Sequence, residues 1–187
     1  KQEDTIFCLD AATGKELWKH TFPAKTWDMA HRGGTLSTPS FAGKLVFASN
    51  REGNFFCFET ATGKLVWHKQ LKDEYRLKYP TWGLATSPLI LGDKVVMNVG
   101  PVLAFDQKGK LLWKTGRSYG DAYSTPADFE FDGKKVFMVT VMGAPGNSNN
   151  AFEVATLAVD PDTGIPLPVF RHTKSGYELS GAEATNT

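Results

Sequence analysis

The sequence lacks an excess of either charge, a long apolar run, and any cluster of cysteine and histidine. Its 187 residues include 21 Lys and Arg against 20 Asp and Glu, without a basic run, so neither a nucleic acid nor an anionic membrane is indicated as a partner. No apolar stretch approaches the roughly 20 residues of a membrane span, and residues 1–4 lack the charged and then apolar pattern of a leader peptide. Because no Cys-x-x-Cys-His sequence and no group of Cys and His occurs, the sequence predicts neither an attached haem nor a structural zinc.

What the sequence contains is one motif repeated four times. Each copy is a strand-like apolar run that ends in an acid and is followed by a turn with Gly, and in three copies Trp follows the Gly by four residues. The glycines recur after 49, 46 and 55 residues, which is the spacing of a propeller or another repeat array. The acids are Asp10, Glu59, Asp106 and Asp160, the glycines Gly14, Gly63, Gly109 and Gly164, and the tryptophans Trp18, Trp67 and Trp113.

A second motif precedes each complete copy of the first, and together they describe a unit of four strands. The second motif begins with Ser37-Thr38-Pro39, Ser87-Pro88 or Ser124-Thr125-Pro126 and continues through a turn into the β-branched and aromatic runs 45–48, 95–97 and 136–139. These runs are apolar at successive positions, which indicates sheets that are covered on both faces. The sequence therefore predicts an all-β protein, a β-propeller of four-stranded antiparallel blades.

Counting these units predicts about three and a half blades in a single domain, residues 1–187. We expect a half blade at 1–35, blades at about 36–84, 85–123 and 124–173, and the start of a next blade at 174–187. Propellers close their ring with roughly four to eight blades. The chain is therefore predicted to be completed by the remaining blades of its parent protein or by another protein chain. A compact four-blade ring closed within the chain is the alternative.

The recurrent residues each have a structural role that we prefer to a catalytic one. Because Trp18, Trp67 and Trp113 recur at one position per blade, we expect each indole to pack in the seam between neighbouring sheets and to donate its N–H to a backbone acceptor. The four acids occupy equivalent turns of separate blades, where short acidic side chains bond turn amides. Equivalent turns of separate blades diverge, so no metal site is expected.

The repeated motif resembles the pyrroloquinoline-quinone-type (PQQ-like) propeller repeat, whose hallmark is Ala-x-Asp-x-x-Thr-Gly-Lys-x-x-Trp, and the resemblance spans essentially the whole chain. Segments 81–89 and 122–126 are similar to secreted bacterial proteins of this class, which implies a periplasmic or secreted location. The same repeat builds quinone-dependent alcohol dehydrogenases, outer-membrane assembly scaffolds and sensor domains that bind no quinone. The fold therefore does not decide the function.

The two cysteines bear on the dehydrogenase alternative. The quinoprotein alcohol dehydrogenases that the chain resembles commonly place a disulfide of adjacent cysteines over the quinone, whereas Cys8 and Cys57 lie 49 residues apart at equivalent positions of neighbouring blades. Packed sheets are about 10 Å apart and bridged cysteines need Cα atoms within roughly 7 Å, so we expect two buried, unbridged thiols. The histidines are scattered along the chain, and no catalytic residue is predicted.

The connectors between blades are where a propeller generally carries its binding residues. Here they are rich in aromatic and charged side chains, the residue types that anchor interfaces and ligands. Because these residues lie in loops, we expect truncation of one of them, such as Tyr75, to change the stability of the protein little. The candidates are Trp27, His31, Arg32, Tyr75, Arg76, Tyr79, Trp82, Arg117, Tyr119, Asp121 and Tyr123. For Trp82 and Tyr123, capping of the seams at the blade ends is an equally good interpretation.

Two segments depart from the repeat. An insert at 142–151 is rich in Gly, Asn and Ser, and Pro168 replaces the Trp of the fourth copy.

We therefore predict a non-catalytic scaffold or binding module that presents its inter-blade loops to a protein, a glycan or a small ligand and needs no cofactor. The alternative is part of a PQQ-dependent alcohol or sugar dehydrogenase, in which calcium would hold the quinone and a carboxylate would act as base. Convergent Glu, Asn and Asp side chains on inner strands would favour the enzyme.

Overall fold

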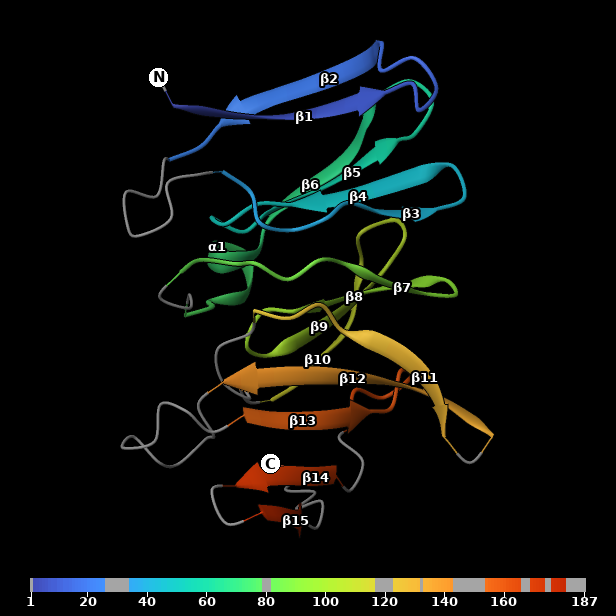
Figure 1. The fold of residues 1–187 in the computed structure, drawn as a ribbon. Helices are drawn as coiled ribbons and strands as arrows, with labels where there is room; N and C mark the ends of the chain where they lie inside the picture. The colour runs from blue at the N-terminus through green and yellow to red at the C-terminus, as the bar shows by residue number, and fades with distance from the viewer. Residues whose placement is uncertain are drawn as a thin grey trace.

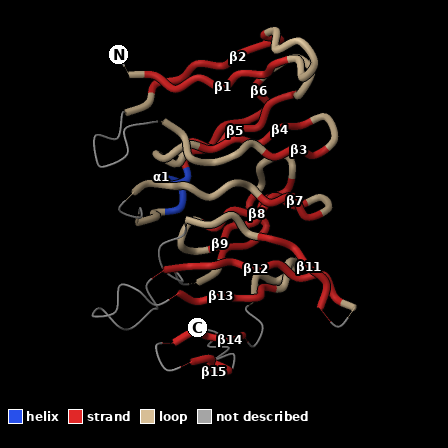
Figure 2. Tube along the Cα trace, in the orientation of Figure 1, coloured by secondary structure: helices blue, strands red, loops and turns tan. Residues whose placement is uncertain are grey.

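The computed structural model describes residues 2–25, 34–78, 82–116, 123–131, 133–142, 154–165, 169–173 and 176–180. In these ranges the chain forms four antiparallel sheets, stacked one upon the next from the N-terminus to the C-terminal strands (Figure 1). Strands dominate, and the short helix α1 (Leu71–Tyr75) lies beside the second sheet (Figure 2). The prediction of an all-β protein built from antiparallel blades is confirmed. No helix within the described ranges is both long and apolar enough to cross a membrane.

The strands follow one another across each sheet in chain order. The first sheet contains β1 (Glu3–Leu9) and β2 (Glu16–Pro23). The second contains β3 (Ser40–Ala42), β4 (Leu45–Ser49), β5 (Asn54–Glu59) and β6 (Leu65–Gln70), and α1 (Leu71–Tyr75) follows it. The third contains β7 (Leu89–Leu91), β8 (Lys94–Asn98), β9 (Val102–Asp106) and β10 (Leu111–Lys114). The fourth contains β11 (Ala127–Phe131), β12 (Lys134–Met142), β13 (Val154–Val159), β14 (Val169–Thr173) and β15 (Gly176–Ser180).

The fourth sheet differs from the sequence prediction at its outer edge. The sequence predicts that residues 174–187 open a new blade, whereas Gly176–Ser180 pair with β14 as a fifth strand, with Val169 opposite Ser180. An edge strand leaves a row of N–H and C=O groups unpaired. The backbone groups of β14 pair with those of β15, so the two strands form a local hairpin.

Side chains on both faces of the second sheet are buried against its neighbours. In β5, Phe56 and Phe58 pack toward the first sheet with Phe22, whereas Phe55 and Cys57 pack toward the third sheet. The third and fourth sheets are joined by an apolar cluster of the same kind. Successive strand residues point to opposite faces, and each of these faces meets another sheet, which is why the runs are apolar at every position.

The motif tryptophans lie in the seams between successive sheets, each over the glycine of the next motif turn. Trp18 Nε1 donates to the carbonyl of Thr60 over 2.8 Å, and a Cβ placed on Gly63 would lie 2.5 Å from Trp18 Cδ2. Gly63 also has a φ of +69°, so the turn requires glycine both for its backbone and for the ring above it. The equivalent contacts are Trp67 with Gln107 and Gly109, and Trp113 with Pro161 and Gly164.

The motif acids bond the turns of their own blades, as the sequence predicts. Asp10 Oδ1 accepts from the hydroxyl of Thr13 at 2.7 Å and from its backbone N–H at 2.8 Å. These hydrogen bonds, the hydroxyl first, lower the pKa of the Asp10 carboxyl. Asp106 and Asp160 accept from backbone N–H groups of their turns in the same way. Each of these carboxylates thus accepts hydrogen bonds from the turn of its own blade.

Both cysteines are free thiols, as predicted, but they differ in burial. Cys57 is fully buried between the second and third sheets, and this burial raises the pKa of its thiol to about 12. Cys8 is half-buried where the sequence predicts full burial. Its strand β1 belongs to a sheet of two strands, which provides less cover than a complete blade.

We expect a thiol-specific disulfide reagent near pH 8 to label Cys8 in the folded protein and both cysteines after unfolding. The thiolate is the form that attacks such reagents, and both the raised pKa and the burial of Cys57 suppress that attack. Mass spectrometry of the two cysteine peptides identifies the labelled residue. Labelling of Cys57 in native buffer as fast as Cys8 would contradict the packing described.

Candidate functional site

The β4–β5 turn organises the end of the stack where the N-terminus and α1 lie in Figure 1. Asn50 Oδ1 accepts from the backbone N–H groups of Glu52 and Asn54 at 3.1 and 3.0 Å, which fixes the turn. Asn50 Nδ2 donates to Asp4 Oδ2 at 3.4 Å, and the Thr35 hydroxyl donates to the same oxygen at 3.4 Å. One turn therefore holds β1 and the chain that leads into β3.

The same turn also holds the chain that leads into β7. The N–H of Leu84 donates to the carbonyl of Arg51 at 3.0 Å, and a Cβ on Gly83 would lie 3.0 Å from Arg51 Cβ. Gly83 has a φ of +77°, so a side chain is disfavoured there on two grounds. The side chain of Trp82 is 39% exposed, and its backbone N–H donates to the Tyr123 hydroxyl at 3.4 Å. The structure thus presents an exposed indole on a backbone that is held from two sides.

Tyr75 is not the exposed loop residue that the sequence predicts. It ends α1 and is half-buried, with its ring edge-on to Phe105 at 5.7 Å between centroids. The helix begins at Leu71, which is buried, and the Gln70 side chain caps it by accepting from the N–H of Lys72 at 3.1 Å. The apolar ring therefore packs on the core between the second and third sheets.

Arg76 follows α1 in a left-handed conformation, with φ 52° and ψ 48°. Its backbone N–H donates to the carbonyl of Lys72, which closes the helix in a manner that glycine usually provides. The Arg76 side chain is exposed. This end of the molecule therefore carries an exposed guanidinium on a backbone that the helix cap positions.

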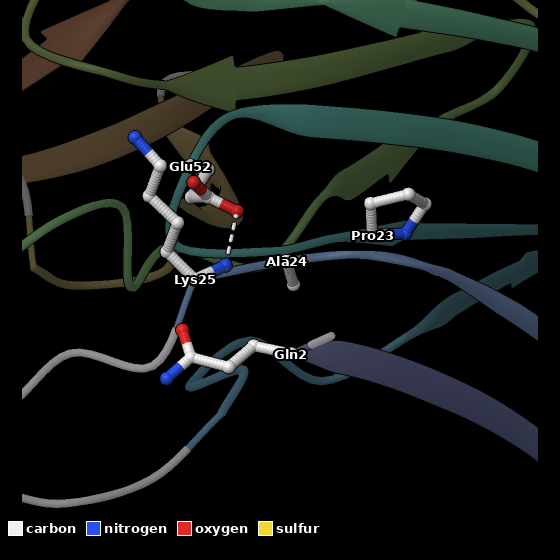
Figure 3. Close-up of a pocket in the computed structure, with 5 residues that line it drawn as sticks. All are labelled: Gln2, Pro23, Ala24, Lys25 and Glu52. Carbon is white, nitrogen blue, oxygen red and sulfur yellow. Dashed lines mark hydrogen bonds between the residues drawn. The ribbon is translucent and has the colours of Figure 1, made fainter.

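An open depression of about 320 Å³ lies between the first sheet and the β4–β5 turn. It is lined by Gln2, Pro23, Ala24, Lys25 and Glu52 (Figure 3). The backbone N–H of Lys25 donates to Glu52 Oε2 at 2.9 Å, and the N–H of Ala24 donates to the Gln2 carbonyl at 3.1 Å. The depression therefore offers an amide, an ammonium and a carboxylate beside two small apolar side chains.

Hydroxyl groups connect the segments that precede β3, β7 and β11. The N–H of Thr38 donates to Ser87 Oγ at 2.7 Å, and the N–H of Ser87 donates to Thr125 Oγ1 at 3.2 Å. The repeated Ser-Pro and Thr-Pro sequences thus link one blade to the next by hydrogen bonds. Asn98, at the end of β8, is fully buried, and neither amide atom has a partner among the described residues.

His20 and His68 pack on Phe56 at the seam between the first and second sheets, with ring centroids 5.5 and 4.5 Å from the Phe56 centroid. Burial lowers the pKa of both imidazoles, as expected for rings in an apolar seam. In the described ranges no three His, Cys, Asp or Glu side chains come together as metal ligands.

Only part of the predicted site falls within the described residues. The candidates outside them are Trp27, His31, Arg32, Tyr79, Arg117, Tyr119 and Asp121, together with residues 143–151 of the insert. Of the remaining four, the structure joins Trp82 to Tyr123 and places Tyr75 and Arg76 at the end of α1. The sequence analysis missed Arg51 and Glu52, for which the polar run 50–54 with its Gly53 is the available signal.

Comparisons with known proteins agree on the fold. A family model described as outer membrane protein assembly factor BamB matches residues 2–165. BamB from Moraxella catarrhalis aligns with a TM-score of 0.53 at 15% identity, over 87% of this chain and 41% of that chain. Quinohemoprotein alcohol dehydrogenase from Comamonas testosteroni aligns with a TM-score of 0.65 at 16% identity, over 92% of this chain and 32% of that chain. A europium-containing methanol dehydrogenase aligns with a TM-score of 0.60 at 16% identity, over 87% and 37%.

These likenesses concern the fold, because the same architecture carries different functions at such low identity. The chain spans 41% of the length of the Moraxella catarrhalis protein and less of the two dehydrogenases. A comparison with curated proteins gave no match.

Proposed function

The chain belongs to the family described as outer membrane protein assembly factor BamB, and on this premise we propose that it is a non-catalytic propeller scaffold. Its connector-bearing end binds a protein segment; a glycan and a small ligand are the other occupants to be tested. The PQQ-like repeat that the sequence motif resembles is confirmed by the family match. The function itself rests on the chemistry of the connector end.

The exposed indole of Trp82 is the observation that carries the proposal. Its backbone N–H donates to the Tyr123 hydroxyl. The two residues that follow it lie against Arg51, since Gly83 packs there and the Leu84 N–H donates to the Arg51 carbonyl. A side chain on a backbone that is already ordered loses less conformational entropy when a partner binds. Tryptophan and arginine dominate the binding energy of many protein interfaces, and exposed Arg76 lies at the end of α1.

The depression beside the β4–β5 turn supports a protein segment as the occupant. Gln2, Lys25 and Glu52 offer donors and acceptors at its rim, and Pro23 and Ala24 offer apolar surface. An extended peptide exposes backbone amides and side chains in alternation, so it has groups for both kinds of lining. The depression and Trp82 are linked through one turn, since Arg51 and Glu52 are neighbours in the chain.

The proposal includes completion of the propeller and a periplasmic or secreted location. The family description names an outer-membrane assembly factor, which supports that location. The chain spans less than half of the length of the Moraxella catarrhalis protein and of the two dehydrogenases, which supports completion by the remaining blades of its parent protein or by another protein chain.

Selection of displayed peptides tests the proposed function. A library of linear peptides is selected on the folded protein, and calorimetry gives the affinity of enriched peptides for the wild type, Trp82→Ala and Phe41→Ala. Truncation of a central interface aromatic typically removes 2 kcal/mol or more, so we expect Trp82→Ala to weaken binding roughly 30-fold. Phe41 is the matched control, because it is an exposed aromatic on β3, toward the opposite end of the second sheet. Phe41→Ala should keep the wild-type affinity.

Two results would count against this function. Equal affinity of the selected peptides for wild type and Trp82→Ala would remove the indole from the site. Saturable binding of pyrroloquinoline quinone with calcium, accompanied by dye-linked oxidation of an alcohol, would support the dehydrogenase alternative instead.

A further inference from the structure

The segment between α1 and β7 carries two exposed cations and an exposed indole. Arg76 and Lys78 follow the helix, Trp82 comes after them, and residues 76–82 include no acid. Neither Arg76 nor Lys78 forms an ion pair with a residue that the structure describes, and the same holds for the exposed Lys25 in the depression. This end of the molecule therefore presents cationic N–H donors and an aromatic ring.

The acids at the same end are mostly engaged within the protein. Glu52 Oε2 accepts from the backbone N–H of Lys25 at 2.9 Å. Glu74 Oε2 lies 3.4 Å from Lys69 Nζ. Asp73, in the first turn of α1, is exposed. The exposed cations outnumber this acid, which favours a ligand that is rich in hydrogen-bond acceptors.

The backbone groups of the turns and connectors at this end bond to one another. The N–H of Leu71 donates to the Gly53 carbonyl at 2.8 Å, and the N–H of Leu84 donates to the Arg51 carbonyl at 3.0 Å. A peptide that binds as an added strand needs a row of unpaired N–H and C=O groups, which lies along the edge of a sheet. The strands of the second sheet end here instead. A ligand with many backbone N–H groups would therefore find few acceptors at this end.

A proline-rich segment meets both conditions. Proline has no backbone N–H, and in the polyproline II conformation the backbone carbonyls make no internal hydrogen bonds. This conformation is already formed in solution, so little conformational entropy is lost on binding. Aromatic side chains line the known kinds of site for such segments. Here the Tyr123 hydroxyl accepts from the Trp82 N–H at 3.4 Å, which brings two aromatic residues together.

We propose that the connector end binds a proline-rich segment in the polyproline II conformation, with acidic residues beside the prolines. Trp82 and Tyr123 pack against the proline rings, and Arg76 and Lys78 bind the carbonyl and carboxylate oxygens. This inference rests on the proposed binding of a protein segment and names the kind of segment. The cationic contacts are exposed, so binding weakens as the salt concentration rises.

Titration of the full chain with short peptides tests the inference. The probe is an oligoproline peptide flanked by Asp residues. In one control Gly replaces alternate prolines, and in the other Lys replaces the Asp residues. We expect the probe to shift the nuclear magnetic resonance signal of the Trp82 indole N–H and to bind at least roughly tenfold more tightly than either control, because the Gly control must be ordered on binding and the Lys control is repelled.

Three variants of the chain test the two kinds of contact. Trp82→Ala should weaken binding of the probe roughly tenfold or more. Arg76→Gln keeps a long polar side chain on the same left-handed backbone, and it should weaken binding and reduce its dependence on salt. Lys44→Gln removes an exposed cation from the β3–β4 turn, at the far end of β4, and should leave both unchanged.

The outcomes separate this inference from the proposed function. Equal binding of the probe and the Gly control would overturn the inference, as would an effect of Arg76→Gln no larger than that of Lys44→Gln. Displayed peptides that bind through Trp82 without enrichment of proline would reject the proline-rich segment and keep the proposed function. Failure of every peptide to bind would reject both. Binding of a glycan at Trp82 in place of the peptides would also overturn the inference.

Discussion

Trp67→Ala is expected to lower the free energy of unfolding by about 3–5 kcal/mol, as truncation of other large packed aromatics does. The indole packs between the second and third sheets, with ring centroids 5.2 Å from Phe55 and 5.8 Å from Phe47. It also covers Gly109, and its Nε1 donates to the Gln107 carbonyl at 3.0 Å. Truncation would remove this packing and leave that carbonyl without its donor. Denaturant unfolding followed by circular dichroism measures the loss.

The matched control for this variant is Trp82→Ala. Trp82 is exposed on a connector, so its truncation should change the unfolding free energy by less than about 1 kcal/mol. Tyr75→Ala is not a suitable control, because Tyr75 packs edge-on against Phe105 in the core. Similar losses in Trp67→Ala and Trp82→Ala would contradict the division between seam and connector.

Gly63→Ala is expected to destabilise the protein by about 2–5 kcal/mol. A left-handed residue with a Cβ costs roughly 1–2 kcal/mol, and an overpacked contact adds about 1–3 kcal/mol. Both apply here, since φ is +69° and the new Cβ would lie 2.5 Å from Trp18 Cδ2. The indole is held by its hydrogen bond to Thr60, so it moves away only if the seam opens. Chemical denaturation at constant pH gives the difference.

Gly14→Ala isolates the part of that effect that comes from the indole. Its φ of +71° imposes the same backbone strain, but none of the residues that the structure describes lies within 4 Å of its Cβ position. The variant should therefore lose only about 1–2 kcal/mol. If Gly14→Ala and Gly63→Ala lost equal stability, the covering of Gly63 by Trp18 would not be a stabilising contact.

Much of the fold follows from residues that lie close together in the sequence. The apolar runs around Phe55 and Leu103 predict buried strands, and Asp10 and Thr13 with Gly14 predict the turn that the structure shows. Strand order within the second and third sheets follows as well, because short turns join neighbouring antiparallel strands. The candidate site is less accessible to such reasoning. The pairing of Trp82 with Tyr123 joins residues 41 positions apart, and neither residue specifies the other.

The sequence by itself determined the repeat, the blade unit and the tryptophan seam, because turn chemistry and strand periodicity act over a few residues and recur in each copy. Only the tertiary structure decided that Tyr75 packs in the core and that β15 extends the fourth sheet. It also decided that Gly14 is uncovered among the described residues, whereas a tryptophan covers the glycine of each of the other three motif turns. The physical reason is that burial depends on which surfaces meet. Similar local sequences form similar turns, and the neighbouring sheet determines whether each turn is covered.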